Sequence, residues 1–570
     1  MTVDQLEADA VRQWAVTATT ALGSARTRID AVNLFPVPDS DTGTNVFLTV
    51  ASGSGALAAL GRDATAADVA VAFARGSLVG ARGNSGVIVS QFLEGFALSL
   101  ESRPDAGAVG PLELAEAFEA AQLAARAAVV EPVEGTVLTA ATRAAEAASG
   151  RARTGGSLVG VLGAAVDAAH ACVLESRDVL PVLRDAGVVD AGAWALLVLL
   201  EALRTSVESR GRGSPTPAAE IASFDDRGPG DHPGCVARAE HLGHVEKVAR
   251  GGGEFEVMFL VEPTDRGGPD LGAALRSRMR AVGDSVAVVG GHGVWQVHVH
   301  TDDPAGAILA GALAAQRQIT VRSVALQLPD AAPAATGRGS VGGLGVVVGT
   351  RARALVADLA RTGAVVHLLT DRAPSAGELV RAIVDTGCAE VVVLPGDRAA
   401  VATALRVTAR PQFSGDGARV HVLPADDDLS VVVAVATIVE NPADDAGARV
   451  GAVERALRGL RTIVVDGPSA GASGPALGAL DGRREVDAPS LDSDAAVGAV
   501  LAALADGVPR IVTVLTGNRA DDRAVDGLVH AVRTRHPGSE VVVLGAGVDR
   551  PSLAIGIQSL ADPTTDGGAS

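Results

Sequence analysis

Hydrophobic periodicity changes twice along this chain of 570 residues and divides it into three regions. Residues 1–205 contain long segments rich in Ala, Leu and Val, broken by Gly, Pro and Asp, which predicts an all-helical domain. Residues 234–328 combine short β-like runs with two helical segments, which predicts a small α+β domain. Residues 341–561 alternate Val-rich runs with helical segments, the pattern of a doubly wound α/β domain with parallel strands.

Two segments rich in Gly, Pro and Ser, 206–233 and 329–340, are typical of linkers between these regions. The helices expected in the first region span 5–29, 43–60, 65–75, 84–100, 112–129, 136–148, 157–175 and 191–205. In the second region we expect strands over 255–261, 285–289 and 294–300 and helices over 270–282 and 304–316. In the third region we expect strands over 344–348, 364–369, 390–394, 419–423, 461–465, 510–515 and 540–544.

Composition excludes several classes of protein. The net charge of −19 and the 2% of aromatic residues argue against nucleic acid as a partner, because phosphate neutralisation and base stacking need the opposite. Lysine occurs once, at Lys247, and no GxxxxGK[ST] motif is present, which excludes a P-loop. Three widely spaced cysteines suit a reducing cytoplasm. No apolar run approaches the ~18 residues of a membrane span and no signal peptide precedes the first helix, so we expect a cytoplasmic location.

Residues 33–45, NLFPVPDSDTGTN, are the most informative segment. Asp39 and Asp41 stand two positions apart, just before Thr42 opens a helix. Two hard oxygen donors close together suit Mg²⁺, which recruits phosphate oxygens as further ligands. A turn with an Asp side chain capping the helix is the alternative interpretation of the same residues.

Three more loops also open helices. They are GARGNSGVIVSQ (80–91), PVEGTVLT (132–139) and LPVLRDAGVVDAG (180–192). Glycines let the backbone approach an anion, and helix N-termini bind anions, so four such loops meeting at one end of a bundle would bind a nucleotide. An ordinary helix–helix connection is the alternative for each loop taken alone. In the third region LPGD (394–397), LPADDD (423–428) and LTGN (515–518) follow strands, where α/β sheets place binding loops; ordinary turns are again the alternative.

The segments FPVPDxDTGTN, GARGNSGV, PVEGT and LPVLxxAGVVDAG, in this order and spacing, resemble the DhaL-like nucleotide-binding domain of the fatty acid kinase A family. That domain is related to the ATP-binding subunit of dihydroxyacetone kinases. VHVHTDDP (297–304) resembles the middle domain of the same family, and the third region is similar to DegV-type lipid-binding proteins. The resemblance implies an antiparallel barrel of about eight amphipathic helices that binds Mg–ATP at one mouth, with acid-bound Mg²⁺ and helix N-termini replacing the lysine of a P-loop.

The resemblance also implies roles for individual residues. Asp39 and Asp41 would be the catalytic carboxylates that hold Mg²⁺, with Asn33 as a further ligand. Asp190 and Gly192 would close the site. The residues implied to line the phosphates and the nucleoside are Thr42, Gly43, Thr44, Asn45, Gly83, Asn84, Ser85, Gly135 and Thr136.

Two positions depart from the pattern of the family. Ser40 stands where PDGDTGTN has its first glycine, and a positive φ there would cost on the order of 1 kcal/mol. The usual DAGGQG reads DAGAWA, with Ala193, Trp194 and Ala195 in the last three positions. Trp194 either packs into the nucleotide pocket or fills the core.

His298 and His300 alternate with valines in a strand-like run, so both imidazoles share one face. Such a pair can bind zinc, and a half-exposed strand face without metal is the alternative. The resemblance implies a third ligand at a cysteine position that Glu256 occupies here, which gives a candidate Zn²⁺ site of Glu256, His298 and His300.

The resemblance therefore implies an ATP- and Mg²⁺-dependent kinase. Its substrate would be a fatty acid carboxylate presented by a separate DegV-like fatty-acid-binding carrier, and its product an acyl phosphate for phospholipid synthesis. The third region would bind that carrier, and a homodimer is the assembly typical of the family. The alternatives are a kinase of a small hydroxy compound such as dihydroxyacetone, and a catalytically weakened regulator or scaffold.

Overall fold

The computed structural model describes residues 5–35, 40–103, 109–129, 132–212, 253–263, 270–291, 293–324, 326, 340–341, 343–409, 418–441, 445–465, 493–549 and 551–559. They form two compact units, one of residues up to Asp302 with two short later segments, the other mainly of residues from Asp330 onward. The predicted linkers lie largely outside the described residues. At their edges, the last helix of the first region continues to Arg212, and a short strand, β5 (Ser340–Val341), begins at Ser340.

The first unit opens with a helical domain. All eight segments expected to be helical are helical, and a short helix that the sequence did not predict, α8, precedes the last one. The helices are α1 (Ala8–Ala31), α2 (Thr42–Ala56, followed by the 3₁₀ turn η1, Leu57–Ala59), α3 (Ala66–Val79), α4 (Gly83–Glu101), α5 (Pro111–Ala127), α6 (Val137–Arg153), α7 (Leu158–Val179), α8 (Pro181–Ala186) and α9 (Ala191–Arg212).

Aromatic side chains organise the core of this helical domain. The indole of Trp14 in α1 is fully buried and donates its Nε1–H to the carbonyl oxygen of Leu199 in α9 over 2.9 Å. Its ring packs edge-on against Phe73 of α3 and Phe96 of α4, at centroid distances of 5.4 and 5.3 Å. Small alanines fill much of the remaining interior, so the helices approach one another closely.

Helix α7 is the one helix, among those in the described part of the chain, that is long and apolar enough to cross a membrane. The sequence analysis did not predict a membrane-spanning segment here. In the structure 44% of the apolar 18-residue stretch of α7 is buried, and Leu158, Val161 and Leu162 belong to the helical core. The core of the domain thus accounts for the apolar character of α7.

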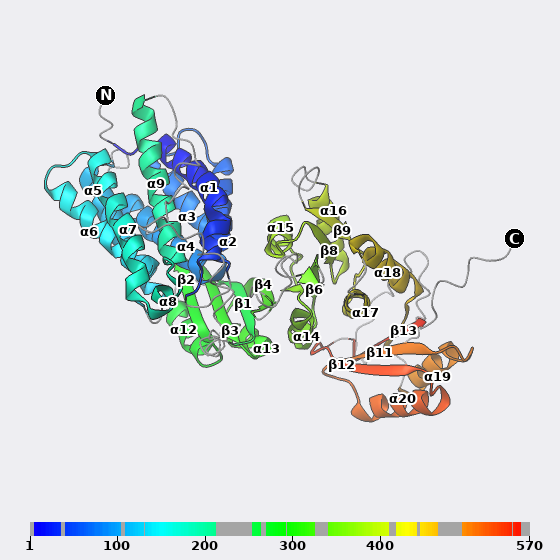
Figure 1. The fold of residues 1–570 in the computed structure, drawn as a ribbon. Helices are drawn as coiled ribbons and strands as arrows, with labels where there is room; N and C mark the ends of the chain where they lie inside the picture. The colour runs from blue at the N-terminus through cyan, green and yellow to red at the C-terminus, as the bar shows by residue number, and fades with distance from the viewer. Residues whose placement is uncertain are drawn as a thin grey trace. The chain divides into compact units, whose positions relative to one another are not determined.

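The rest of the first unit is the predicted α+β region. Strands β1 (Phe255–Glu262), β2 (Asp284–Gly291) and β3 (Val294–Thr301) form an antiparallel sheet with β3 in the middle, and helices α12 (Leu271–Arg280) and α13 (Pro304–Ala310) accompany it. The predicted helix 304–316 is too long, because β4 (Ala315–Ser323) begins before its end. Figure 1 shows the sheet at one end of the helical bundle, where β2 contacts α3 and α4.

The second unit contains every strand predicted for the third region. β4 pairs antiparallel with β7 (Val365–Leu368), and β7, β6 (Leu344–Thr350), β8 (Glu390–Leu394) and β9 (Arg419–Val422) follow in parallel, as predicted. A second sheet has the order β10 (Arg461–Val465), β13 (Leu553–Ser559), β11 (Arg510–Thr516) and β12 (Glu540–Gly545). Here the parallel prediction is wrong in part, because β13 lies antiparallel between β10 and β11.

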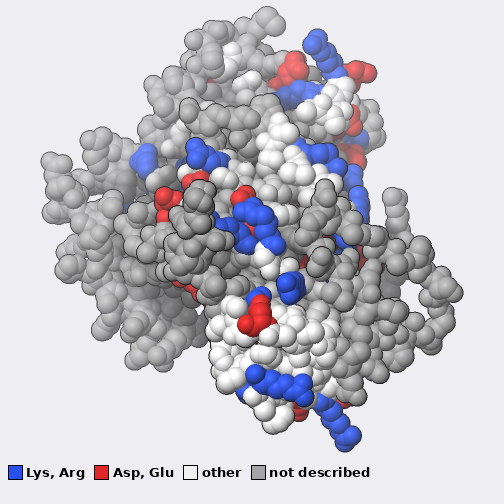
Figure 2. All heavy atoms as spheres, turned by 90° about the vertical axis from the view of Figure 1, so that its right-hand side faces the viewer, with Lys and Arg blue, Asp and Glu red and all other residues white. Residues whose placement is uncertain are grey.

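Helices cover both sheets of the second unit. They are η7 (Arg353–Leu355), α14 (Val356–Arg361), α15 (Ala376–Asp385), α16 (Arg398–Thr408), α17 (Asp428–Glu440), α18 (Ala446–Gly459), α19 (Ser493–Ala503) and α20 (Asp522–Arg535). On the face of the molecule drawn in Figure 2, the described basic and acidic side chains lie interspersed among uncharged ones.

Candidate active site

The starts of α2 and α4 are joined by a direct hydrogen bond. The hydroxyl oxygens of Thr42, the first residue of α2, and Ser85, in the first turn of α4, lie 3.0 Å apart. Gly83 begins α4 with a φ of +54°, and a Cβ there would overlap with the side chain of Asn45. The starts of α2 and α4, which are far apart in sequence, therefore pack directly against each other.

Asp41 precedes α2 at its N-cap position, and its side chain makes no capping hydrogen bond. Capping of α2 by this Asp side chain, the alternative interpretation from the sequence, is therefore not what the structure shows. The side chains of Asp41 and Asn33 are buried, with 7% and 2% of their surface exposed. The other acid, Asp39, lies outside the described residues.

Ser40 has a φ of +51°, in the left-handed region that glycine adopts most easily. The glycine of the family pattern thus fits this turn, because glycine adopts a positive φ without steric cost. A serine there carries a strain on the order of 1 kcal/mol, directly beside Asp41.

Three of the residues implied to contact phosphate make contacts within the helical domain. Thr44 is bound to α1, since its backbone N–H and its hydroxyl donate to the carboxylate of Asp30 over 3.0 and 2.7 Å. A Cβ on Gly43 would overlap with the carbonyl oxygen of Arg26, so this glycine lets α2 approach α1. Asn45 is buried against Gly83. Asp30, which the sequence did not single out, anchors the start of α2.

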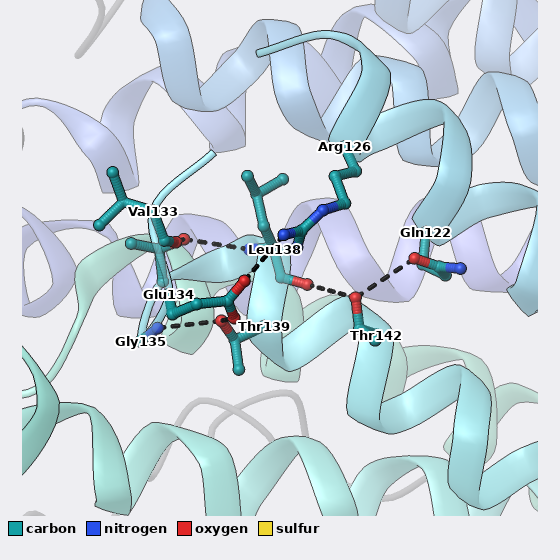
Figure 3. Close-up of polar contacts among 9 residues, drawn as sticks. Gln122, Arg126, Val133, Glu134, Gly135, Leu138, Thr139 and Thr142 are labelled. Carbon is teal, nitrogen blue, oxygen red and sulfur yellow. Dashed lines mark hydrogen bonds and ion pairs between the residues drawn. The ribbon is translucent and has the colours of Figure 1, made fainter. Parts of the chain in front are cut away.

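The start of α6 is held by a polar network, drawn in Figure 3. The hydroxyl of Thr136 caps the helix by accepting from the N–H of Leu138, and it donates to the carbonyl oxygen of Val133 over 2.8 Å. Gly135, with a φ of +84°, donates its N–H to the hydroxyl of Thr139 over 2.9 Å. That hydroxyl donates in turn to Glu134 over 2.7 Å, and Glu134 also accepts from Arg126 over 2.8 Å.

Asp190 connects the starts of α6 and α9. Burial raises the pKa of this carboxyl from its ordinary 3.8 to about 7, although hydrogen bonds from the backbone N–H groups of Ala193, Val137 and Gly192 act in the opposite direction. The bond from Ala193 measures 2.7 Å. The backbone N–H of Asp190 itself donates to Ser176 of α7 over 2.8 Å.

Trp194 fills the core and not the pocket. Its side chain is 2% exposed and belongs, with Ala193 and Ala195, to the hydrophobic core of the helical domain. The guanidinium of Arg28 stacks over its ring at 5.0 Å from the centroid. The second departure from the family pattern therefore leaves the space in front of α9 open.

That space is a cavity of about 700 Å³, within the range of small-molecule sites. Starts of four helices contribute to it, through Thr42 of α2, Asn84 and Ser85 of α4, Thr136 at α6, and Asp190 and Gly192 at α9. The residues Asn33, Asp41, Gly43, Thr44, Asn45, Gly83 and Gly135 are not among its described lining.

The opposite wall comes from the α+β region, which sequence reasoning did not connect with this site. Arg280 at the end of α12 and Asp284 and Ser285 at the start of β2 line the cavity. The remaining lining residues are mostly apolar: Phe35, Ile88, Val129, Val133, Val137, Leu138, Gly283, Val286 and Ala287. No local signal in the sequence pointed to this wall; it follows from the packing of β2 on the helices.

Glu256, His298 and His300 come together on the β1–β3 sheet. Glu256 lies opposite His300 in the register, and one ligand atom from each of the three side chains falls within 4.8 Å of the others. The His298 Nδ1 atom is 3.4 Å from Glu256 Oε1, and all three side chains are buried. Two imidazoles and a carboxylate this close together are a ligand set that zinc accepts.

A second cavity, of about 730 Å³, lies in the second unit at the carboxyl ends of β6, β8, β11 and β12. The loops 394–397, 423–428 and 515–518 all reach it. Its charged lining is mainly acidic, and consists of Arg351, Arg353, Asp371, Asp397, Asp426, Asp427, Asp428 and Asp549. Burial raises the pKa of Asp428, which accepts hydrogen bonds from the Thr350 hydroxyl over 2.6 Å and the Arg351 N–H over 2.9 Å.

Comparison with known proteins identifies the parts of the chain. Residues 36–205 match the family model of the DAK2 domain. Residues 252–328 match the model of the fatty acid kinase A-like middle domain, and residues 346–558 match the model of the fatty acid kinase A-like C-terminal domain.

Curated relatives are similar to about half of the chain. Protein YloV of Bacillus subtilis is 34% identical over 279 residues, which are 48% of this chain and 48% of YloV. An uncharacterized protein of Staphylococcus epidermidis is 32% identical over 282 residues, 48% of this chain and 47% of that protein. The chain thus spans about half the length of the curated relatives it matches.

Solved structures give weaker matches. A DegV family protein, Cg2579 of Corynebacterium glutamicum, is 16% identical with a TM-score of 0.28, over 38% of this chain and 97% of that one. The dihydroxyacetone kinase of C. freundii, in complex with AMP-PNP and Mg²⁺, is 21% identical with a TM-score of 0.26, over 34% of this chain and 33% of that one.

With a DAK2 domain followed in order by the two fatty acid kinase A-like domains, the chain belongs to the fatty acid kinase A family.

Proposed function

We propose that this protein is an ATP- and Mg²⁺-dependent kinase that phosphorylates a fatty acid carboxylate presented by a separate DegV-like carrier protein. The observation that carries the proposal is the convergence of four helix starts on one cavity, with the Thr42–Ser85 pair at its wall. Helix N-termini attract anions through unpaired N–H groups and the helix dipole, and hydroxyl groups add hydrogen bonds. This arrangement suits the phosphates of a nucleotide.

The donor set beside the cavity fits magnesium. Asp41 carries a buried carboxylate that is not used to cap α2, and Asn33, also buried, offers an amide oxygen. Together with Asp39, they would hold Mg²⁺, which neutralises charge on the phosphates when it is bound. Hard oxygen donors are those that Mg²⁺ prefers.

The proposed reaction is a phosphoryl transfer. A carboxylate oxygen of the fatty acid forms a bond to the γ-phosphorus of ATP. The bond from that phosphorus to the β–γ bridging oxygen breaks, and ADP leaves with the electron pair. Side chains such as Ser85 and Asn84 would hold the phosphate chain in line, and positioning of this kind supplies much of the catalysis in phosphoryl transfer.

The acidic cavity of the second unit supports the proposal that a separate protein carries the fatty acid. Six aspartates in its lining would repel a free fatty acid carboxylate, so the chain's own DegV-like part is a poor site for that substrate. We therefore propose that the C-terminal region binds a carrier that holds the acyl chain. A cytoplasmic location, a homodimer and a role in phospholipid synthesis are parts of the same proposal.

The Glu256–His298–His300 group fits Zn²⁺ by the nature, number and closeness of its ligand atoms. We propose that these three residues hold a zinc ion in the middle domain. A metal there would tie β1 to β3 and stabilise the sheet whose edge strand, β2, reaches the cavity.

The test combines binding with turnover. The purified full chain is titrated calorimetrically with Mg–ATP, and acyl phosphate is measured with and without a DegV-type protein loaded with fatty acid. We expect carrier-dependent acyl phosphate, and we expect Asp41→Asn to abolish it. Asp185→Asn, which changes an exposed aspartate of α8, is the matched control and should keep full activity.

Other outcomes decide against the proposal. Turnover of dihydroxyacetone without a carrier would establish the kinase of a small hydroxy compound. A chain that folds and does not bind Mg–ATP would establish the regulator or scaffold. Full activity of Asp41→Asn would remove the magnesium assignment.

A further inference from the structure

The cavity contains three ionisable side chains in its described lining, and one of them is a cation. Two are the carboxyls Asp190 and Asp284, and the third is the guanidinium of Arg280. The starts of α6 and α9 already donate N–H groups to Asp190, so part of their attraction for anions is used. A positive side chain would add charge-assisted hydrogen bonds to a triphosphate in this space, and Arg280 is the one that the described lining offers.

The backbone at the start of β2, a few residues after Arg280, is strained where it lines the cavity. Ser285 has a φ of +50°, unusual for a residue with a Cβ. The register between β2 and β3 shifts between Asp284 and Ala287, as in a β-bulge. Bulges and positive-φ residues cost energy, and they are found preferentially where a side chain must be aimed at a ligand. Here the irregular stretch is the part of β2 that lines the cavity.

The irregular stretch is also fixed to the helical domain. Ala287 forms an isolated antiparallel bridge with Val129, just after α5. Beside it, Ala287 and Val289 share a hydrophobic cluster with Leu78, Ala81, Val87 and Ala128 of the helical domain. The turn from α12 into β2 is therefore held against the helices by a backbone bridge and apolar packing, and its side chains face the cavity from a defined position.

We propose that the α12–β2 turn of the middle domain is the second wall of the nucleotide site, and that Arg280 binds the phosphates of the nucleotide there. This inference rests on the proposed function, since it assumes that Mg–ATP occupies the cavity. The middle domain then supplies a cation to a cavity whose described lining from the helical domain contains no lysine or arginine. Because Arg280 contacts the phosphates directly, it selects a polyphosphate over a nucleoside.

The test uses the full chain and three ligands. Calorimetric affinities for Mg–ATP, Mg–ADP and adenosine are measured for the wild type, Arg280→Gln, Arg280→Lys and Arg278→Gln. Arg278 stands on the same helix, is exposed and is outside the cavity lining, so its variant is the matched control. We expect Arg280→Gln to weaken Mg–ATP binding by about tenfold or more, the range for a hydrogen bond to a charged group.

Adenosine affinity should stay unchanged in Arg280→Gln, because adenosine has no phosphate, and a lysine should restore part of the affinity for Mg–ATP. A merely structural role would lower the affinity for all three ligands alike. Equal binding of Mg–ATP by Arg280→Gln and the wild type would overturn the inference while leaving the kinase proposal intact. Failure of the wild type itself to bind Mg–ATP would instead overturn the proposed function, so the two failures are distinguishable.

Discussion

Asp190 should make the stability of the helical domain depend on pH. Its pKa is about 7 in the folded chain and near the ordinary 3.8 when the chain is unfolded. At pH values between these two, the folded state binds a proton that the unfolded state has lost, so the free energy of unfolding falls as the pH rises. At 1.36 kcal/mol for each pKa unit, the whole effect is on the order of 4 kcal/mol. It is complete above about pH 7.

Asp190→Asn isolates this contribution, because asparagine has nearly the same shape and does not titrate. The variant also changes the hydrogen bonds that this side chain accepts from the backbone, but an asparagine does not titrate, so that cost is the same at every pH and cancels from the slope. We therefore expect the wild type to lose stability relative to Asp190→Asn between pH 4 and pH 7, by an amount on the order of 4 kcal/mol.

Urea unfolding followed by tryptophan fluorescence is a suitable assay, because Trp14 and Trp194 are both buried in the core of the helical domain. The two proteins are compared at several values between pH 4 and pH 8, with Asp185→Asn as an exposed control that should run parallel to the wild type. A difference between wild type and Asp190→Asn that stays constant over this range would refute the reasoning, because it would mean that Asp190 titrates normally in the folded chain.

Three further predictions concern other parts of the first unit. Gly43→Ala should lower the free energy of unfolding by about 1–3 kcal/mol in urea titrations, because its Cβ would overlap with the carbonyl oxygen of Arg26; an unchanged midpoint would contradict this close approach. Ser40→Gly should raise the free energy of unfolding by up to about 1 kcal/mol by relieving the φ of +51°, and a loss of stability would argue against strain there. His298→Ala should abolish zinc binding measured by metal analysis, whereas the exposed His530→Ala should not; retained zinc would exclude the Glu256–His298–His300 site.

Local sequence patterns were sufficient to predict most elements of this fold. Every expected helix of the first region is present, because Gly, Pro and Asp mark the helix ends and the apolar residues recur with helical spacing. Strand β4 was missed because AQRQITVRS is largely polar, and β13 was missed because Gly556 lies in its middle. Its antiparallel direction depends on pairing with β10 and β11, which are distant in sequence.

The candidate site was predictable on one side only. The motifs at the helix starts pointed to Ser85, Thr136 and Asp190, which do line the cavity. Sequence could not separate these from Gly43, because a glycine that lets two helices approach and one that admits a ligand both need the absence of a Cβ. Arg280 and its neighbours have no motif of their own, since their position depends on how β2 packs on the helical domain.

The bridge between Val129 and Ala287 has a consequence for the order of events during synthesis. The helical domain leaves the ribosome before β2, at a stage when the wall supplied by Arg280 to Ala287 has not yet been made. Only after β2 has emerged and docked does the pocket acquire its second wall. The cavity is therefore complete only when both domains have been synthesised.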